Sequence, residues 1–440
     1  MKVVIMAGGK GTRISSLFHD IPKPMIKIDD RPVLEHELEC LRDQGFNDII
    51  ITVSHLGDVI MDYFGDGSGN SPATGKPFGV KIEYFNEQVP LGNAGALFKL
   101  RDRFTEDFLL LNADAIFDID FRRFVDFHKS QGSLVTLFTH PNSHPYDSGL
   151  IISDENRNVM SWLTKEDSRP LYYKNRVNAG LHVINPKILD DCNIDVSMIG
   201  CEKDDGTIFK VDLDRNLLKP LAGTGMMSCY DSPEYVKDMG TPERFESVKK
   251  DFLAGIVKAR NLSCRQKAIF LDRDGTINKY VGFLRDINDF ELISGASEAI
   301  RKINESGYLA IVVTNQPVVA RGDVTIKELD DIHEKLETEL GKSGAYIDAI
   351  YYCPHHPDKG FEGEIPELKI ECDCRKPKPG MLLRAAEDYN IDLSKSFMIG
   401  DSEADAEAGL KAGCVSYQIS QNDGASLIKA IDTIIGKDGL

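Results

Sequence analysis

Phe270-Leu-Asp-Arg-Asp-Gly-Thr-Ile-Asn278 opens the second half of this 440-residue chain. The apolar run before it, Ala268-Ile-Phe-Leu271, is typical of a buried strand, and Asp and Gly residues mark the loop that ends the run. Asp272 and Asp274 therefore follow the end of a strand, where parallel α/β sheets carry their binding and catalytic groups. This stretch predicts an α/β domain with a site at these two carboxylates.

Composition and charge narrow the class of protein. The chain is 42% hydrophobic and 28% charged, as soluble globular proteins are. Its formal charge of -18 disfavours non-specific binding to nucleic acid or to an anionic membrane, so we expect neither partner. No apolar run approaches the roughly 18 residues of a membrane span, and the N-terminus lacks a signal-peptide layout, so we expect a cytoplasmic protein. The nine cysteines, three of them grouped with histidine, favour metal binding or buried thiols over disulfides.

The N-terminus repeats the pattern of a strand followed by a loop. Val3-Val-Ile-Met6 predicts a buried strand, and Ala7-Gly-Gly-Lys-Gly-Thr-Arg13 follows it. Three glycines allow backbone N–H groups to approach phosphate oxygens, and Lys10 and Arg13 add positive charge. Lys23 stands between two prolines, which make its segment stiff. These features indicate a site for a phosphorylated ligand.

Strands and helices alternate along the first half. We expect further strands at Asp48–Ser54, Val80–Phe85, Phe108–Asn112 and Val177–Ile184, and helices at Leu34–Gln44, Ala94–Phe104 and Phe245–Arg260. We therefore expect a first domain over residues 1–255 and a second domain over residues 267–440. Residues 256–266, the end of a helix and a polar joint, would connect them.

Six motifs of the first half together resemble the sugar-1-phosphate nucleotidyltransferases. They are Ala7-Gly-Gly-Lys-Gly-Thr-Arg13, Pro22-Lys-Pro24, Pro90-Leu-Gly-Asn-Ala-Gly95, Asn112-Ala-Asp114, Asn178-Ala-Gly180 and Asp238-Met-Gly-Thr241. The resemblance implies a Rossmann-like domain with a mixed sheet. It also implies a reaction in which a sugar phosphate attacks the α-phosphorus of a nucleoside triphosphate and pyrophosphate leaves.

The same resemblance assigns roles to individual residues. Arg13 and Lys23 neutralise the reacting phosphates, and Asp114 and Asp238 hold Mg²⁺. The expected substrate-binding residues of this domain are Gly8, Gly9, Gly11, Thr12, Glu87, Gly92, Asn178 and Gly180. The family's Glu-Lys pair is represented here only by Thr164-Lys165, which leaves open whether Lys165 binds the sugar phosphate.

In the second half, four motifs resemble in order those of the haloacid dehalogenase phosphatase superfamily. They are Asp272-Arg-Asp274, Thr314-Asn315, Arg375-Lys376 and Gly400-Asp401. The resemblance implies a Rossmann-like domain with a parallel sheet and, given the length of this half, no large cap domain.

A phosphate ester is surrounded by negative oxygens, so a carboxylate nucleophile needs cations beside it. By the resemblance, Asp272 is that nucleophile, and Asp274 is the general acid and base. Mg²⁺ is held by Asp272, the backbone carbonyl of Asp274 and Asp401. The expected substrate-binding residues are Thr314, Asn315, Arg375 and Lys376.

A separate pattern predicts a zinc site. Cys353-Pro-His-His-Pro357 and Cys372-Asp-Cys374 supply two pairs of soft ligands, which suit one tetrahedral structural Zn²⁺. The expected set is Cys353, His355, Cys372 and Cys374, although His356 is adjacent and remains an alternative. Because Cys374 precedes Arg375-Lys376, the metal would fix the loop that carries these cations.

The zinc pattern narrows the resemblance to the D-glycero-D-manno-heptose-1,7-bisphosphate 7-phosphatases, and the related histidinol-phosphate phosphatases share the zinc loop. Removal of the 7-phosphate leaves heptose 1-phosphate, which the first domain could activate. The transferase fold resembles the guanylyltransferases of the GDP-heptose branch, which implies GTP and surface-polysaccharide synthesis, including lipopolysaccharide. The alternatives are another sugar-nucleotide pathway, such as GDP-mannose supply, and a first domain that senses ligand without turnover. The sequence leaves the oligomeric state open.

Overall fold

The computed structural model describes the chain except for residues 10–20, 193, 361 and 439–440. The chain folds into two compact units. The first comprises Met1–Thr139, Ile151–Trp162 and Asn178–Asn261, and the second comprises Leu262–Leu440 together with His140–Leu150 and Leu163–Val177. None of the described helices combines the length and the apolar character that a membrane crossing requires.

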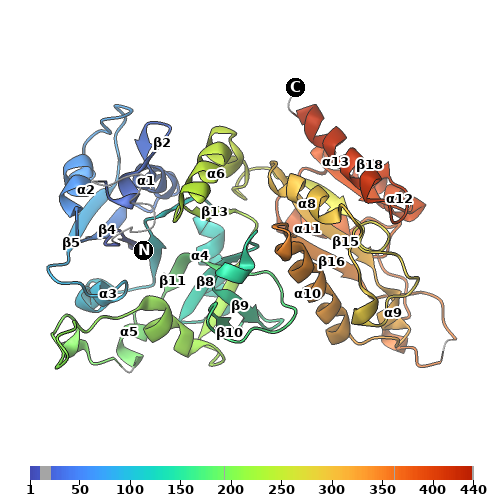
Figure 1. Ribbon diagram of the computed structural model, residues 1–440, viewed down its shortest axis with the longest axis horizontal. Coiled ribbons are helices and arrows are strands. Elements are labelled where there is room, and N and C mark those ends of the chain that lie inside the picture. Colours follow the sequence, from blue (N-terminus) through green and yellow to red (C-terminus); the bar gives the residue numbers. More distant parts are fainter. Residues whose placement is uncertain (10–20, 193, 361, 439–440) are drawn as a thin grey trace. The chain divides into compact units, whose positions relative to one another are not determined.

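A mixed sheet forms the centre of the first unit (Figure 1). Strand β1 pairs in parallel with β4 and β6, whereas β11 is antiparallel to β6, as the predicted mixed sheet requires. The order is β10-β9-β11-β6-β1-β4-β5, with β8 pairing with β11 and β12. The strands are β1 (Val3–Met6), β4 (Asp48–Val53), β5 (Lys81–Asn86), β6 (Phe108–Asn112), β8 (Val135–His140), β9 (Leu150–Ser153), β10 (Val159–Leu163), β11 (Val177–Ile184) and β12 (Met227–Asp231).

Two smaller strand pairs complete the strands of this unit. β7 (Ala115–Asp118) and β13 (Tyr235–Asp238) are antiparallel, with Asp238 opposite Ala115. β2 (Lys27–Ile28) and β3 (Arg31–Pro32) form a short hairpin ahead of helix α1. The first pair sets the backbone of Asp238 beside the start of β7, one residue after Asp114.

Alternate residues of β1 face two separate cores. Val3 and Ile5 pack with α1, α2 and α4, whereas Val4 packs with α3 and α5 on the other face of the sheet. The helices of this unit are α1 (Val33–Asp43), α2 (Gly57–Phe64), α3 (Gly95–Lys99), α4 (Phe121–Gln131), α5 (Ile188–Asp191), α6 (Pro242–Leu253) and α7 (Ile256–Ala259).

Two helices differ from their predicted lengths. The helix expected over Ala94–Phe104 is α3, which ends at Lys99 and is followed by a 3₁₀ turn, Arg101–Arg103. The helix expected over Phe245–Arg260 is interrupted between α6 and α7. Gly255 has φ +74° there, a left-handed conformation that ends a right-handed helix.

A five-stranded parallel sheet forms the centre of the second unit, in the order β16-β15-β14-β17-β18. Leu271 of β14 pairs with Val312 of β15 and with Ile399 of β17. The carboxyl ends of these three strands therefore meet at one edge of the sheet. The strands are β14 (Lys267–Leu271), β15 (Tyr308–Asn315), β16 (Ala349–Cys353), β17 (Phe397–Gly400) and β18 (Val415–Gln418).

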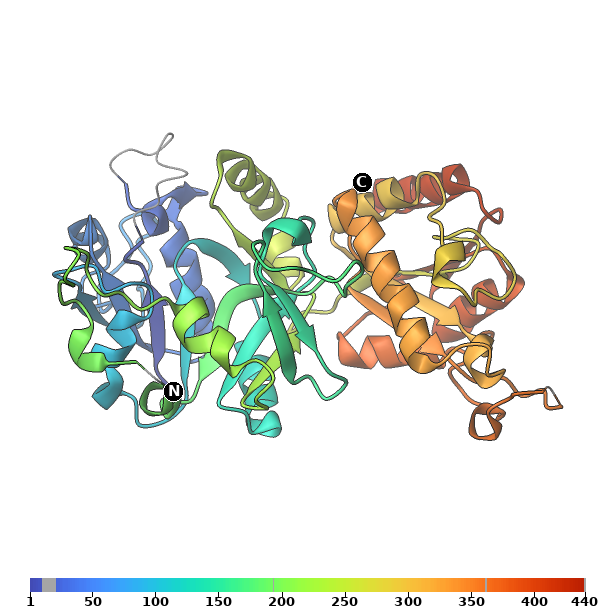
Figure 2. The same cartoon turned by 60° about the horizontal axis from the view of Figure 1, so that its bottom comes forward.

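Helices cover both faces of this sheet (Figures 1 and 2). Helices α8, α10 and α13 share a core with Ile269 and Leu271, whereas α11 and α12 pack on the side of Ala268 and Phe270. The helices are α8 (Ala296–Asn304), α9 (Pro317–Ala320), α10 (Ile326–Lys342), α11 (Gly380–Asp388), α12 (Glu403–Ala412) and α13 (Gly424–Asp438). The unit is thus an α/β domain with a parallel sheet, as the sequence predicts.

Candidate active sites

The second unit brings the residues of all four predicted motifs to one pocket at the edge of its sheet. The pocket has a volume of about 290 Å³. Its lining includes Asp272, Asp274, Thr314, Asn315, Arg375, Lys376 and Asp401. It also includes residues for which the sequence predicts no role, namely Tyr280, Phe283, Gln316, Ser402, Asp405 and Gln421.

Lys376 is the buried cation of this pocket. Its Nζ donates to Asp272 Oδ1 at 2.7 Å, to the backbone oxygen of Val313 at 2.8 Å, and lies 2.5 Å from Asp405 Oδ1. Burial raises the pKa of Asp272 to about 7, against the nearby Lys376, which lowers it. Lys376 therefore compensates two buried carboxylates and directs one oxygen of Asp272.

Asp274 is held by three donors. Arg273 Nη2 lies 2.9 and 2.8 Å from its two oxygens, Asn278 Nδ2 lies at 2.9 Å and Gln316 Nε2 at 2.8 Å. Burial alone would raise the pKa of Asp274, but Arg273 and these hydrogen bonds outweigh burial and lower it. The arrangement fixes the carboxyl group two residues after Asp272 and favours its charged form.

Thr314 and Asn315, at the end of β15, form hydrogen bonds with different residues. Gln316 Nε2 donates to Thr314 Oγ1 at 2.9 Å, which leaves the Thr314 hydroxyl hydrogen free to donate to a phosphoryl oxygen. Asn315 instead exchanges two hydrogen bonds of 3.0 Å with the backbone of Lys376. The Asn315 side chain thus holds the backbone of Lys376, and Asn315 also lines the pocket.

Three carboxylates of this pocket could hold a magnesium ion. Asp272, Asp401 and Asp405 each present an oxygen within 4.8 Å of the others. Hard carboxylate oxygens suit Mg²⁺, so the donor set fits the predicted cofactor. The structure adds Asp405 to the ligands that the sequence predicts.

The predicted zinc ligands also come together. Cys353 Sγ lies 3.5 Å from Cys372 Sγ and 3.1 Å from Cys374 Sγ, and His355 Nδ1 lies 3.3 Å from Cys374 Sγ. Ligand atoms bound tetrahedrally to zinc at 2.3 Å are separated by about 3.8 Å, so these distances fit one ion. Hydrogen bonds from Cys353 and Cys372 lower the pKa of Cys374 to about 5, which favours a thiolate ligand.

The structure separates the two adjacent histidines. His355 turns Nδ1 to the sulfur atoms, whereas His356 Nδ1 accepts a hydrogen bond of 3.2 Å from the backbone of Asp358. Arg375 Nη1 donates to the backbone oxygen of His355 at 3.3 Å. The cluster therefore connects directly to Arg375, which lines the pocket.

The first unit contains a larger cavity of about 610 Å³. Six predicted site residues line it, namely Gly8, Gly9, Lys23, Glu87, Gly92 and Asp114. Asn93 of the Pro90–Gly95 motif also lines it, as do residues for which the sequence predicts no role, including Ser54, His55 and Lys210. Gly11, Thr12 and Arg13 fall within residues 10–20 and lie outside the described residues.

The two predicted magnesium ligands of this unit have different partners. Lys23 Nζ lies 3.1 Å from Asp114 Oδ2 at the cavity wall. Asp238 instead accepts hydrogen bonds from Arg244 Nη1 at 3.0 and 2.9 Å and from the backbone of Gly240 at 2.8 Å. Arg244 therefore competes with a metal ion for the Asp238 carboxylate.

Asn178 and Gly180 lie on β11, where Gly180 is next to the cavity residue Asn112. Gly180 has φ +76°, and a Cβ atom there would lie 2.3 Å from Nδ2 of Asn112, a cavity residue. Asn178 Oδ1 accepts from the backbone of Gly180 at 3.3 Å and lies 3.2 Å from His182 Nε2. The structure thus gives these two residues a packing role next to Asn112.

Lys165, for which the sequence leaves a role in binding the sugar phosphate open, lies near an acidic residue. Its Nζ lies 3.9 Å from Asp147 Oδ1, with 62% of its side chain exposed, and it belongs to the second compact unit. Lys210, in contrast, lines the cavity of the first unit and adds a cation there.

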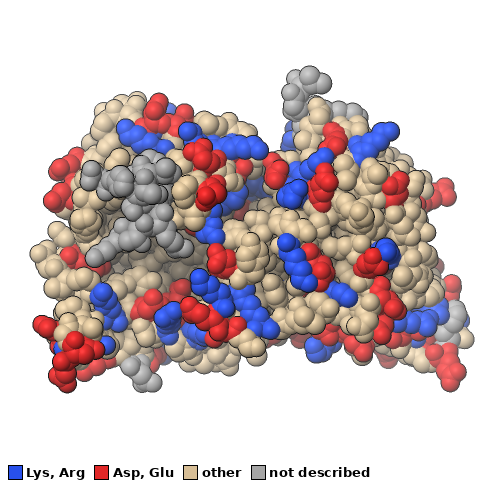
Figure 3. Space-filling view, viewed as in Figure 1, with Lys and Arg blue, Asp and Glu red and all other residues tan. Residues whose placement is uncertain are grey.

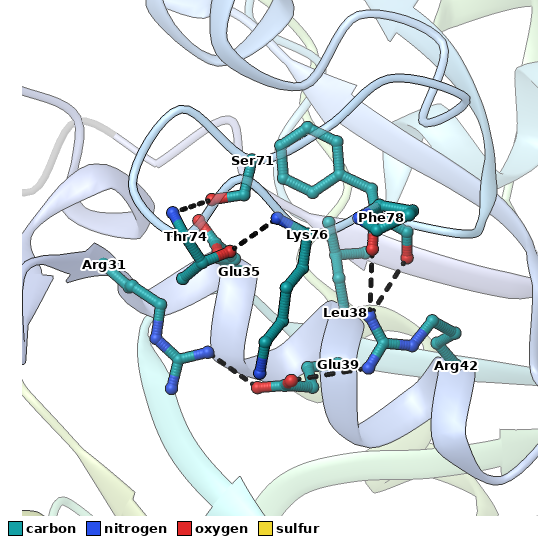
Figure 4. A pocket seen from close by; sticks show the side chains of 10 residues that line it. Arg31, Glu35, Leu38, Glu39, Arg42, Ser71, Thr74, Lys76 and Phe78 are labelled. Atoms are coloured by element: carbon teal, nitrogen blue, oxygen red, sulfur yellow. Dashed lines mark hydrogen bonds and ion pairs between the residues drawn. The ribbon is translucent and has the colours of Figure 1, made fainter.

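A third pocket lies beside helix α1 and is lined by Arg31, Glu39 and Arg42 among others. In Figure 4, Arg31 and Arg42 both reach Glu39, at 2.7 and 3.4 Å. Its volume of about 10 Å³ is too small for a substrate. On the face drawn in Figure 3, basic and acidic side chains are interspersed, as expected for a solvated surface.

Comparisons with known proteins identify relatives of both halves of the chain. The nucleotidyl transferase family model matches residues 2–253, and a HAD-hydrolase-like model matches residues 373–424. The D-glycero-beta-D-manno-heptose-1,7-bisphosphate 7-phosphatase of Yersinia pestis is 43% identical over 145 residues, covering 33% of this chain and 75% of the relative. The enzyme of the same name from Pasteurella multocida is 45% identical over 144 residues, covering 33% of this chain and 76% of the relative.

Among solved structures, HddC from Yersinia pseudotuberculosis is 26% identical, with a TM-score of 0.46, and the match covers 57% of this chain and 99% of that protein. The nucleotidyl transferase model spans more than half of the chain, and the phosphatase relatives are matched over three quarters of their length. The chain therefore belongs to the nucleotidyl transferase family through its first half and to the family of these 7-phosphatases through its second, and it is a bifunctional enzyme that joins a nucleotidyltransferase to a phosphatase.

Proposed function

We propose that the chain catalyses two consecutive steps of GDP-heptose synthesis. The phosphatase removes the 7-phosphate of D-glycero-D-manno-heptose 1,7-bisphosphate, and the transferase joins GMP from GTP to the resulting heptose 1-phosphate with release of pyrophosphate. The observation that carries this proposal is the Asp272–Lys376–Asp405 cluster beside the cluster of Cys353, His355, Cys372 and Cys374. The same chain also has the cavity of a nucleotidyltransferase. The phosphatase relatives are named for the bisphosphate, and the guanine base rests on the sequence resemblance.

In the first reaction, an oxygen of Asp272 attacks phosphorus while the bond from phosphorus to the sugar oxygen breaks. Asp274 gives its proton to that leaving oxygen, then takes a proton from the water that attacks the aspartyl phosphate. Arg273 and the hydrogen bonds that lower the pKa of Asp274 favour the carboxylate form, which takes the proton from water in the second transfer. Lys376 and the Thr314 hydroxyl neutralise the transferring oxygens.

Magnesium would supply charge neutralisation between the Asp272 nucleophile and the phosphate. Asp272, Asp401 and Asp405, together with the backbone carbonyl of Asp274, would hold it. The four-residue Cys/His cluster would hold a structural Zn²⁺, which orders the loop leading to Arg375. We assign Arg375 to the phosphate that the sugar keeps.

In the second reaction, an oxygen of the sugar 1-phosphate attacks the α-phosphorus of GTP and the bond to pyrophosphate breaks. The chain supplies no nucleophile for this step, so its contribution is to position and neutralise the phosphates. Lys23, Gly8 and Gly9 lie at the cavity in positions suited to that role, and Asp114, joined by Asp238 when Arg244 releases it, would hold Mg²⁺.

The test is to incubate the chain with heptose 1,7-bisphosphate and each nucleoside triphosphate in turn and to follow the products by mass. The expected result is GDP-heptose, phosphate and pyrophosphate with GTP alone. Formation of another nucleotide sugar, or phosphate release confined to other sugars, would replace this pathway by a different one. Asp272→Asn should stop phosphate release and leave nucleotide transfer to supplied heptose 1-phosphate intact.

A further inference from the structure

The segment Gln418–Asn422, which follows β18, lies outside the four phosphatase motifs but contacts the last of them. The backbone of Ile419 donates to Gly400 O at 2.9 Å, and Gln418 Nε2 donates to the backbone oxygen of Asp401 at 3.2 Å. Gln421 Nε2 donates to Asp401 Oδ2 at 2.7 Å. Three hydrogen bonds thus tie this segment to the end of β17 and to the carboxylate of Asp401.

Asn422 makes the opposite connection, to the loop that follows Asp274. Its backbone N–H donates to Gly275 O at 2.8 Å, and its Oδ1 accepts from the backbone of Tyr280 at 2.7 Å. Asn422 has φ +60°, a left-handed conformation that asparagine tolerates better than most residues. The segment Tyr280–Leu284 forms part of the pocket lining and is here called the rim. The hydrogen bond to Tyr280 therefore fixes one end of this rim.

The absence of a side chain at Gly275 lets the loop after Asp274 pack closely against Asp401 and Gln421. A Cβ atom there would lie 2.4 Å from Asp401 Oδ2 and 3.1 Å from Cγ of Gln421. The catalytic loop, Asp401 and Gln421 therefore pack without room for a side chain at position 275. A carboxylate packed in this way has little freedom to rotate.

We propose that Gln421 and Asn422 are positioning residues of the phosphatase. Gln421 orients the Asp401 carboxylate for Mg²⁺, and Asn422 holds the Tyr280–Leu284 rim against the substrate. The inference rests on the phosphatase function proposed above. A neutral amide suits the first role because it orients one oxygen of Asp401 without bringing a positive charge that would compete with the metal. Such partners of a metal ligand typically contribute 10- to 100-fold in metal affinity.

The first experiment compares Gln421→Ala with Ser420→Ala, an adjacent change at a side chain that makes no hydrogen bond to the described residues. Mg²⁺ binding to the full chain is measured by calorimetry with MgCl₂ and no substrate. The heat that disappears in Asp401→Asn identifies the phosphatase site. Phosphate release from heptose 1,7-bisphosphate is measured over a range of MgCl₂ concentrations.

For Gln421→Ala we expect Mg²⁺ binding about 10- to 100-fold weaker, with phosphate release recovered at high Mg²⁺ and nucleotide transfer unchanged. Ser420→Ala should keep the wild-type Mg²⁺ affinity. Unchanged Mg²⁺ binding in Gln421→Ala, or a loss of activity that no Mg²⁺ concentration restores, would overturn the proposal. A wild-type chain that binds Mg²⁺ at Asp401 but releases no phosphate would instead refute the proposed phosphatase function, and the binding comparison would still test Gln421.

The second experiment uses Asn422→Gly, which keeps the left-handed backbone and removes the acceptor for Tyr280 N–H. Losing one hydrogen bond of about 1 kcal/mol predicts a KM for the bisphosphate raised about 5-fold, with kcat and Mg²⁺ affinity unchanged. Asn422→Ala, which also strains the backbone, should raise KM at least as much. An unchanged KM in Asn422→Gly, or a change in Mg²⁺ affinity without a change in KM, would contradict the role assigned to Asn422.

Discussion

Lys376 Nζ lies 2.7 Å from Asp272 Oδ1 and 2.5 Å from Asp405 Oδ1. One buried cation therefore contacts two carboxylates that are far apart in the sequence of the second domain. Asp272 follows β14, whereas Asp405 lies on α12, and their like charges would repel without the ammonium group between them. The pair of contacts makes Lys376 the electrostatic centre of the phosphatase site.

Lys376→Met should abolish most phosphatase activity. The variant keeps the length of the side chain but leaves the Asp272 and Asp405 carboxylates without their shared cation, and removing one such group typically lowers kcat by about 10²- to 10³-fold. Phosphate release from heptose 1,7-bisphosphate measures the loss, and nucleotide transfer by the same preparation is the control. A kcat within 3-fold of the wild type would contradict the central role of Lys376.

The two adjacent histidines should respond differently to substitution. His355→Ala removes a ligand that faces the sulfur atoms, so we expect substoichiometric zinc by elemental analysis and a reduced phosphatase activity, because Arg375 bonds to the His355 backbone. His356→Ala removes only the acceptor for Asp358 N–H and should retain one zinc. Zinc loss in His356→Ala and retention in His355→Ala would reverse the assignment.

Arg244→Gln should change the magnesium requirement of the transferase. Arg244 donates to both oxygens of Asp238, so its removal takes away a cation that competes with the metal for this carboxylate. We expect half-maximal pyrophosphate release at a lower Mg²⁺ concentration than in the wild type. Asp114→Asn, in contrast, should lose nucleotide transfer and keep phosphate release. An unchanged Mg²⁺ dependence in Arg244→Gln would argue against Asp238 as a ligand.

Glu37→Leu should stabilise the first domain, increasingly so as the pH rises. The Glu37 carboxyl group is fully buried on α1, without a hydrogen-bond partner among the described residues, and burial raises its pKa well above 4.5. Between pH 4.5 and the raised folded-state pKa, the unfolded chain loses this proton while the folded chain keeps it, so wild-type stability falls with pH.

Replacing the carboxyl by an apolar side chain removes an unsatisfied polar group, for which we expect a gain of about 1–3 kcal/mol. Urea unfolding of the first domain at pH 5 and pH 8 measures the effect, and the gap between variant and wild type should be wider at pH 8. Glu39→Leu is the matched control, because Glu39 pairs with Arg31 and Arg42 and has a lowered pKa, so its loss should not stabilise. A gap for Glu37→Leu that narrows with pH would contradict the sign.

The sequence was sufficient for the parallel sheet of the second domain and for the residues at its edge. Short apolar runs closed by Asp and Gly, such as Ala268–Leu271, favour buried strands, and each is followed directly by its polar motif. The motif residues therefore meet wherever neighbouring strands end together. The members of the Cys/His cluster were predicted in the same local way, from Cys and His at spacings that one tetrahedral ion can use.

Tertiary structure decided which side chains pair across long separations. Gln421 on Asp401, Asn315 on the Lys376 backbone and Arg244 on Asp238 each depend on the final direction of a side chain, which sequence spacing does not encode. The choice of His355 over His356 depends on how the loop after β16 turns. The break at Gly255 likewise depends on a single left-handed residue between two helices whose periodicity reads as continuous. By itself the sequence determined the α/β class and the enzyme class of both domains, because the motifs follow strand ends locally. The partners that orient the motif residues were decided by packing between segments distant in the chain.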